Sequence, residues 1–190
     1  MLLGNNSKIK LFLCSLIYVL AISFGYSQNI KFKRLSIDEG LSASYVNTIF
    51  QDSQDFIWIG TQDGLNRYDG YHIKTYKNDQ YSKTSISSND ISCMFEDKDG
   101  VIYIGSSDGG MSVFNKQKEV FTNYKSGLGS KNISHTSVRH IAELNDNELL
   151  VATENGLNIF DKTTKQFSII KCTNNSSAAD LKYIFKDSKN

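Results

Sequence analysis

The sequence predicts an all-β fold made of repeated four-stranded antiparallel units, and two observations support this prediction. An apolar phrase recurs along the chain at a period of about 45 residues, and paired turn residues recur at matching places in each copy. Within a copy, β-branched and aromatic residues form short segments bounded by Gly, Asn and Asp, as is typical of strands joined by tight turns. These segments lack the 3.6-residue apolar spacing of a helical repeat.

The first 27 residues are expected to be a secretory signal peptide. A short basic region with Lys8 and Lys10 precedes an apolar run at 11–22, and small residues follow at the spacing that a signal peptidase accepts. The run is shorter than the roughly 20 residues that span a bilayer, which disfavours an uncleaved anchor. Cleavage is expected after Ser27, so that residues 28–45 form a lead-in segment to the first unit.

Charge and cysteine content exclude several partners and scaffolds. The chain has 21 basic and 20 acidic residues without a basic patch or stripe in the sequence, so no nucleic-acid partner is expected. Cys93 and Cys172 lack the spacing of a disulfide framework and of zinc ligands, and they are expected to be isolated thiols.

Four phrases in register define the repeat. The steps between their central residues are 45, 47 and 43 residues, and a second phrase opens nine residues after each of the first three. The central residues are Ile49, Met94, Ile141 and Ile184, and the second phrases open at Trp58, Tyr103 and Leu150. The repeat predicts units at 46–90, 91–137 and 138–180, followed by the start of a fourth at 181–190.

Two kinds of turn recur within the units. The turn between the first and second strands has residue types that tolerate positive φ, so a left-handed backbone is expected there in every copy. The turn between the second and third strands has Asp-Gly or Asn-Gly, which predicts type I′ hairpins. The first set is Asp55, Gly100, Asn147 and Asn190, and the second is Asp63-Gly64, Asp108-Gly109 and Asn155-Gly156.

Four antiparallel strands in a unit of this length indicate the blade of a β-propeller. The Trp-Asp mark of WD-type blades is absent, since Ile59 follows Trp58, and only Gly109-Gly110 offers the glycine pair of kelch blades. The sequence therefore predicts a partial propeller of three blades plus the first strand of a fourth. Closed propellers need roughly four to eight blades, so we expect the chain to be the front end of a longer protein.

The first copy, from Val46 to Leu65, resembles the two-component regulator propeller repeat, which has a valine-anchored strand, a turn ending in Trp and an Ile-Gly-Thr hairpin. The lead-in Glu39-Gly40-Leu41-Ser42 resembles the start of that family's first blade. Asp55 stands where the family usually has Gly, and the third copy has Leu150 and Ala152 in place of the Trp and the Gly.

This resemblance implies the periplasmic sensor of a hybrid two-component histidine kinase of Bacteroidetes-type bacteria, a class that often controls polysaccharide use. The expected ligand is then an oligosaccharide. The family's further blades, β-sandwich, membrane helix and kinase core are missing from this sequence, so the chain itself is not expected to be an enzyme. The full-length parent is expected to be a homodimer, and no cofactor is implied.

If a ligand binds, propeller geometry places it on one face of the disc, which is shared by the loops between second and third strands and by those from the fourth strand to the next blade. The loops between second and third strands contribute Gln62, Asp63, Ser107, Asp108, Glu154 and Asn155, and the alternative is that they are solvated hairpin tips.

No catalytic or metal site is predicted. The aspartates fall at turns, where bonds to the backbone explain them, and the glutamates share no repeat position. His135 and His140 are expected on opposite faces of a strand, and Trp58 and Tyr103 are expected in the packing between blades. Two alternatives stay open: a secreted propeller enzyme acting on glycans, and a secreted propeller that binds proteins.

Overall fold

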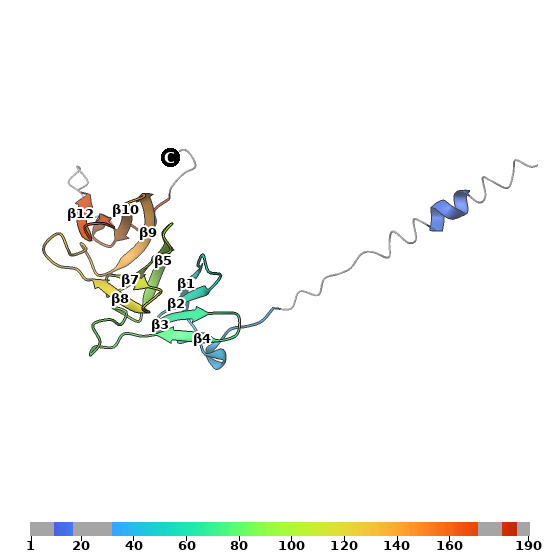
Figure 1. Cartoon of the computed structure of the whole chain (residues 1–190), viewed down its shortest axis with the longest axis horizontal. Coiled ribbons are helices and arrows are strands. Elements are labelled where there is room, and N and C mark those ends of the chain that lie inside the picture. Colours follow the sequence, from blue (N-terminus) through green and yellow to red (C-terminus); the bar gives the residue numbers. More distant parts are fainter. Residues whose placement is uncertain (1–9, 17–31, 171–179, 186–190) are drawn as a thin grey trace, which may run out of the picture. The chain divides into compact units, whose positions relative to one another are not determined.

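The computed structural model describes residues 10–16, 32–170 and 180–185 (Figure 1). The chain divides into two units, Met1–Arg34 and Leu35–Asn190. In the first unit, residues 10–16 form a helix, and the expected cleavage site after Ser27 lies outside the described residues. Within the described ranges, no helix is both long and apolar enough to cross a membrane.

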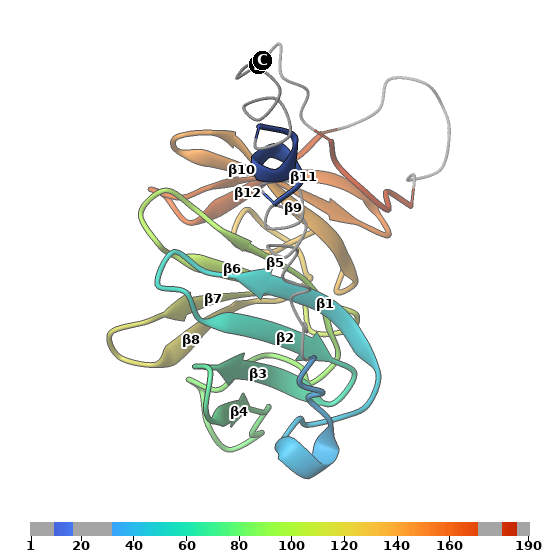
Figure 2. The same ribbon diagram turned by 90° about the vertical axis from the view of Figure 1, so that its right-hand side faces the viewer.

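The second unit contains three four-stranded antiparallel sheets, each made of consecutive strands, as predicted. Figure 2 shows the three sheets following one another in chain order, as the blades of a propeller do. A 3₁₀ turn, η1 (Ile37–Glu39), precedes them. The first blade comprises β1 (Val46–Gln51), β2 (Ile57–Thr61), β3 (Gly64–Tyr68) and β4 (Ile73–Tyr76). The second comprises β5 (Ile91–Glu96), β6 (Ile102–Ser106), β7 (Met111–Asn115) and β8 (Val120–Tyr124), and the third β9 (Val138–Asn145), β10 (Glu148–Thr153), β11 (Gly156–Asp161) and β12 (Gln166–Ile170).

The predicted fourth copy is described only at 181–185, where the chain forms no strand, so its first strand stays a prediction. The amide of Leu181 donates a hydrogen bond of 3.3 Å to the carbonyl of Thr153 at the end of β10.

Two apolar clusters hold the blades together. Trp58 and Leu65 of the first blade are fully buried against Phe114 of the second, and the Trp58 and Phe114 rings meet edge to face at 5.2 Å. Tyr103 and Phe160 take the same places between the second and third blades, at 6.2 Å. Trp58 and Tyr103 therefore lie in the packing between blades, where buried aromatic rings contribute most of the contact area.

A glycine in the second strand lets neighbouring blades approach closely. A Cβ atom on Gly60 would lie 2.6 Å from Cγ2 of Ile91 in the next blade, and one on Gly105 would lie 2.7 Å from Cγ1 of Val138. Both distances are shorter than van der Waals contact, so these strands need glycine for steric reasons.

The connections between blades cover the outer edge strands. The amide of Phe121 in β8 donates to the carbonyl of Thr84, and that of Phe167 in β12 donates to Ser130, both in the connection that precedes the blade. Edge amides are thereby satisfied, which protects the strands from pairing with another chain.

The left-handed turn between first and second strands is confirmed in two blades and wrong in the third. Asp55 and Gly100 have φ of 65° and 76°, whereas Asn147 does not have positive φ. The Asp52 and Asp97 carboxylates organise the first two turns by accepting from amides two and four residues ahead. The third blade has Leu144 at this position, which offers no acceptor, so a shorter turn joins Asn145 directly to Glu148. Asn190 lies outside the described residues.

The type I′ prediction for the second hairpin is wrong. Positive φ occurs at Gly64 (143°) and Gly156 (96°) but not at the Asp63 or Asn155 before them, as in hairpins where a glycine follows the turn. In the second blade the positive φ is at Gly110 (82°) and not at Gly109, because this hairpin has one extra residue.

Candidate functional site

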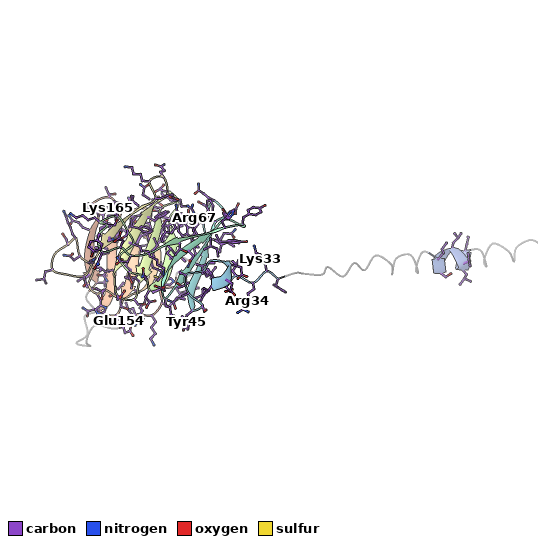
Figure 3. All side chains as sticks on the ribbon, turned by 90° about the horizontal axis from the view of Figure 1, so that it is seen from below. Lys33, Arg34, Tyr45, Arg67, Glu154 and Lys165 are labelled. Carbon is purple, nitrogen blue, oxygen red and sulfur yellow. The ribbon has the colours of Figure 1, made fainter. Side chains whose placement is uncertain are left out.

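The hairpins β2–β3, β6–β7 and β10–β11 lie at one end of the blades, which we call the hairpin face. Figure 3 shows Tyr45 and Glu154 on this side and Arg67 and Lys165 on the opposite side. The amide of Gln62 donates to the carbonyl of Tyr45, so the backbones of these two exposed residues are adjacent. The predicted site residues thus come from equivalent tips of three blades.

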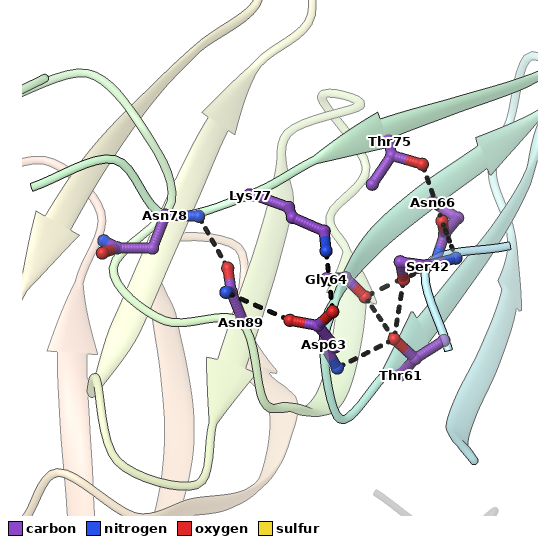
Figure 4. Close-up of polar contacts among 9 residues, drawn as sticks. All are labelled: Ser42, Thr61, Asp63, Gly64, Asn66, Thr75, Lys77, Asn78 and Asn89. Carbon is purple, nitrogen blue, oxygen red and sulfur yellow. Dashed lines mark hydrogen bonds and ion pairs between the residues drawn. The ribbon is translucent and has the colours of Figure 1, made fainter. Parts of the chain in front are cut away.

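A directed chain of hydrogen bonds supports the hairpin of the first blade (Figure 4). The Asn66 amide donates to the Ser42 hydroxyl (2.8 Å), which lies 2.8 Å from the Thr61 hydroxyl, and Thr61 donates to the carbonyl of Gly64 (3.0 Å). Because the Thr61 hydroxyl donates its only proton to the carbonyl of Gly64, the Ser42 hydroxyl must donate to Thr61. Asn66 and Thr61 are fully buried, so the network satisfies polar groups that burial would otherwise penalise.

The third blade repeats this network with Ser134, Thr153 and Asn158. The second blade exchanges two partners. Ser112 replaces the strand-three asparagine and donates to Asn123 on the neighbouring strand (2.8 Å), while Ser87 contacts Ser112 at 2.9 Å. In the first blade the long side chain is Asn66 and the short one is Thr75, whereas in the second blade Ser112 is short and Asn123 is long. The exchange fills the same volume and keeps both groups hydrogen-bonded.

Asp63 is held by its neighbours and is not a free carboxylate. Lys77 forms an ion pair with it at 2.7 Å, and Asn89 donates to its other oxygen at 3.4 Å (Figure 4). Asn89 in turn accepts from the amide of Asn78 (2.7 Å). Asp63 therefore ties the hairpin to the connection that leads into the second blade.

Three more predicted site residues are also engaged. Asp108 accepts from the hydroxyl of Ser88, Glu154 pairs with Arg139, and the side-chain amide of Asn155 lies 3.5 Å from the carbonyl of Ser134. Among the described residues, the side chains of Gln62 and Ser107 have no hydrogen-bond partner, although their backbone amides bond to the segments before β1 and β5. These two are the predicted site residues whose side chains are open to a ligand.

On the opposite face, a lysine of one blade binds a buried aspartate of the blade before it. Lys116 lies 3.1 Å from Asp52 and 2.6 Å from Glu96, and the indole of Trp58 donates to Asp52 at 2.9 Å. Burial raises the pKa of the Asp52 carboxyl, but the bonds from Trp58, Lys116 and the amide of Gln54 outweigh it and hold the pKa below its usual value.

The second and third blades form the same contact. Lys162 lies 3.1 Å from Asp97, and the hydroxyl of Tyr103 donates to the same carboxylate oxygen. Burial raises the pKa of Asp97, and the bonds from the Val101 amide, Lys162 and Tyr103 more than reverse this. The position has Leu144 in the third blade.

The described residues contain no group of three or more His, Cys, Asp and Glu that could hold a metal ion. Cys93 is a buried free thiol whose pKa burial raises to about 12, so it is not a ready nucleophile. Cys172 lies outside the described residues.

Sequence reasoning missed the serine of the buried networks. Ser42, Ser87 and Ser134 precede each blade at steps of 45 and 47 residues, the same steps as the strand anchors. That register was the signal that could have shown them to be structural.

The comparisons with known proteins agree with the blade architecture. The model of the two-component regulator propeller repeat matches residues 40–63 and 85–108. A curated relative, histidine kinase P4 of Formosa agariphila, is 42% identical over 81 residues, which are 42% of this chain and 6% of that protein.

Two solved structures from B. thetaiotaomicron are similar. One is the extracellular domain of a protein assigned as a hybrid two-component system, with 32% identity and a TM-score of 0.67 over 73% of this chain and 20% of that one. The extracellular domain of a second such protein has 18% identity and a TM-score of 0.58 over 80% of this chain and 20% of that one, which shows the fold alone.

The chain spans a fifth or less of each of these proteins. The two matched segments begin in the lead-in of a blade and end in its β2–β3 or β6–β7 hairpin, so they include Ser42 and Thr61 in the first blade and Ser87 and Ser106 in the second. The two matched segments, one in each of the first two blades, are two-component regulator propeller repeats.

Proposed function

We propose that this chain is part of the exported, periplasmic sensor propeller of a hybrid two-component histidine kinase, and that its hairpin face binds an oligosaccharide. The observation that supports this most is the run of consecutive regulator-type blades whose hairpins present polar tips on one face. The kinase chemistry belongs to other parts of such proteins, and this chain contributes recognition.

The hairpin face offers groups suited to a sugar. Gln62 and Ser107 have side chains open to hydroxyl groups, and Tyr45, which is 65% exposed, is bonded through its backbone carbonyl to the amide of Gln62. An exposed aromatic ring next to amide and hydroxyl groups can stack on a sugar and bond to its hydroxyls. The networks beneath the tips fix the hairpin backbone that carries Gln62 and Ser107 before binding, which reduces the ordering cost of recognition.

A sensor needs more than binding. A ligand shifts a signalling equilibrium only if it binds one arrangement of the receptor better than the other. Contacts such as the Lys116–Asp52 pair fix one blade against the next. In this proposal, a ligand that displaces the hairpin face therefore moves whole blades rather than single loops.

The test is calorimetric titration of the full chain with a panel of neutral plant and algal oligosaccharides, followed by the Tyr45→Ala and Gln62→Ala variants. We expect Tyr45→Ala to lose about fivefold or more in affinity, by analogy with bases stacked on aromatic rings, which contribute on the order of 1–3 kcal/mol. We expect Gln62→Ala to lose about two- to tenfold, because a hydrogen bond contributes roughly 0.5–1.5 kcal/mol. Tyr71→Ala and Gln54→Ala, exposed residues at the opposite end of the blade, are matched controls. Equal losses in the controls, or hydrolysis of any oligosaccharide by the chain, would contradict the proposal.

A further inference from the structure

A cleft of about 480 Å³ lies between the second and third blades, beside their edge strands. Three segments line it: the end of β8, the connection from β8 to β9, and the turn from β11 to β12. Their residues are Asn123, Tyr124 and Lys125, then Lys131 and Asn132, then Thr164 and Lys165. The amide of Ile133 donates to the carbonyl of Lys125, which folds the connection back and brings its lysine to the same cleft.

The charge of this cleft is unbalanced. Lys125, Lys131 and Lys165 are exposed, no Asp or Glu lines the cleft, and none of the three forms an ion pair within the described residues. Elsewhere in the described chain, five lysines are paired with carboxylates: Lys74, Lys77, Lys98, Lys116 and Lys162. Lys165 also helps to lower the pKa of the Asp161 carboxyl and lies 6.0 Å from the centre of the Phe160 ring. The three ammonium groups outnumber this carboxylate, so they produce a positive potential that attracts an anion.

A second cleft of about 440 Å³ continues from the first, since both are lined by Asn123 and Lys125. It adds Lys83 and a single acidic residue, Asp79. Two adjoining clefts suit a ligand that is longer than one small ion.

We propose that this pair of clefts binds an acidic oligosaccharide, with a carboxylate or sulfate group at Lys125, Lys131 and Lys165. The requirement for negative charge follows from the lysines, and the choice of a sugar depends on the proposed sensor function. Asn132 donates one amide hydrogen to the carbonyl of Leu128, which leaves its second amide hydrogen for a sugar hydroxyl beside the charged group. Lys165 lies on the side of the blades opposite Glu154 (Figure 3), whereas Lys125 adjoins the β6–β7 hairpin, since a Cβ atom on Gly110 would lie 3.4 Å from its Cα.

A single-stranded nucleic acid fits the cleft less well. Binding of that kind uses exposed aromatic rings on which bases stack. Tyr124 is the one aromatic residue that lines the clefts. Its ring packs edge to face against Phe160 at 5.0 Å and Phe167 at 5.6 Å, so it is not free to stack on a base.

The test titrates the full chain with three probes: a galacturonic acid trisaccharide, its methyl ester, which is neutral and nearly the same size, and a thymidine oligonucleotide. We expect the acidic trisaccharide to bind at least tenfold more tightly than the ester. Its affinity should fall as salt is added, because salt screens exposed charges. We expect Lys131→Gln/Lys165→Gln to lose at least tenfold in affinity for the acid. Lys118→Gln/Lys182→Gln, which removes two exposed lysines outside both clefts, is the matched control.

Equal binding of acid and ester would overturn the inference while leaving the proposed function intact. An equal loss in both double variants would also overturn it, since the effect would then be one of net charge. Tighter binding of the oligonucleotide than of the trisaccharide would show that the clefts take a different polyanion. Failure of all neutral oligosaccharides together with binding of the acid would support the inference and move recognition from the hairpin face to these clefts.

Discussion

Removing Lys116, the lysine that joins the first two blades, is expected to lower the free energy of unfolding by the contribution of this contact. The Lys116→Met substitution keeps an apolar side chain of similar length and removes the positive charge. Asp52, whose side chain is fully buried, and Glu96 then lose the cation with which they pair. Breaking a buried pair by removing one partner costs about 3–5 kcal/mol. Because the Lys116 side chain is 17% exposed and Asp52 keeps its bond from Trp58, we expect the low end, about 3 kcal/mol of unfolding free energy.

The measurement is urea unfolding of the full chain followed by the fluorescence of Trp58, the single tryptophan, whose indole bonds to Asp52. The control is Lys118→Met, an exposed lysine without an ion pair, for which a change within about 0.5 kcal/mol is expected. A loss below about 1 kcal/mol for Lys116→Met at neutral pH would refute the reasoning.

The pH dependence gives a second check on the same residue. The folded-state pKa of Asp52 lies below its ordinary value of 3.8, so its ionised form stabilises the fold above that pH, and this contribution is lost as the pH falls through the folded-state pKa. Protonation removes the uncompensated charge in Lys116→Met. The difference in unfolding free energy between the two proteins should therefore shrink below about pH 4. A constant difference across this range would mean that the methionine acts through packing alone.

Three further predictions follow from the blade contacts. Gly60→Ala should cost about 1–3 kcal/mol of unfolding free energy, measured by urea titration, because the new Cβ would lie 2.6 Å from Ile91, whereas Gly70→Ala has open space and tests the left-handed backbone alone. Ser42→Ala should cost about 1–3 kcal/mol, since it leaves buried partners unsatisfied, and an unchanged stability would show that water replaces the hydroxyl. The Cys93 thiol should resist a thiol reagent at pH 8 in the native chain and react on unfolding, as read from the labelled peptide by mass spectrometry, because burial raises its pKa to about 12.

The repeat made the blades predictable, because strand anchors and turn residues must recur in register if each unit packs in the same way. Trp58 and Tyr103 were placed correctly between blades for this reason. The hairpin type was not predictable from Asp-Gly, since the Thr61 hydroxyl accepts from the amide of Asp63 and stabilises a turn with positive φ only at Gly64. An extra glycine in the second blade shifted the same feature to Gly110.

The candidate sites were less predictable, for two physical reasons. A polar residue at a hairpin tip looks the same in a sequence whether it is free, like Gln62, or bound, like Asp63 with Lys77. Contacts between blades also join residues far apart in the chain: Lys162 reaches Asp97 across 65 positions, and the cleft lysines come from three separate segments. A chain with nearly balanced charge therefore conceals a local positive cleft until the fold is known.

The third blade differs from the first two at positions that act together. In the first two blades, an aromatic donor and a lysine of the next blade bind one buried aspartate, and a glycine permits close approach. The third blade has Leu150, Leu144 and Ala152 at the aromatic, aspartate and glycine positions. It therefore lacks the hydrogen-bond donor, the carboxylate that accepts from it, and the glycine that permits close approach. Loss of one alone would leave an unsatisfied buried group, whereas loss of all three removes the donor, the acceptor and the space for close approach at once. The contact that joins an aspartate of one blade to a lysine of the next therefore has no aspartate in the third blade.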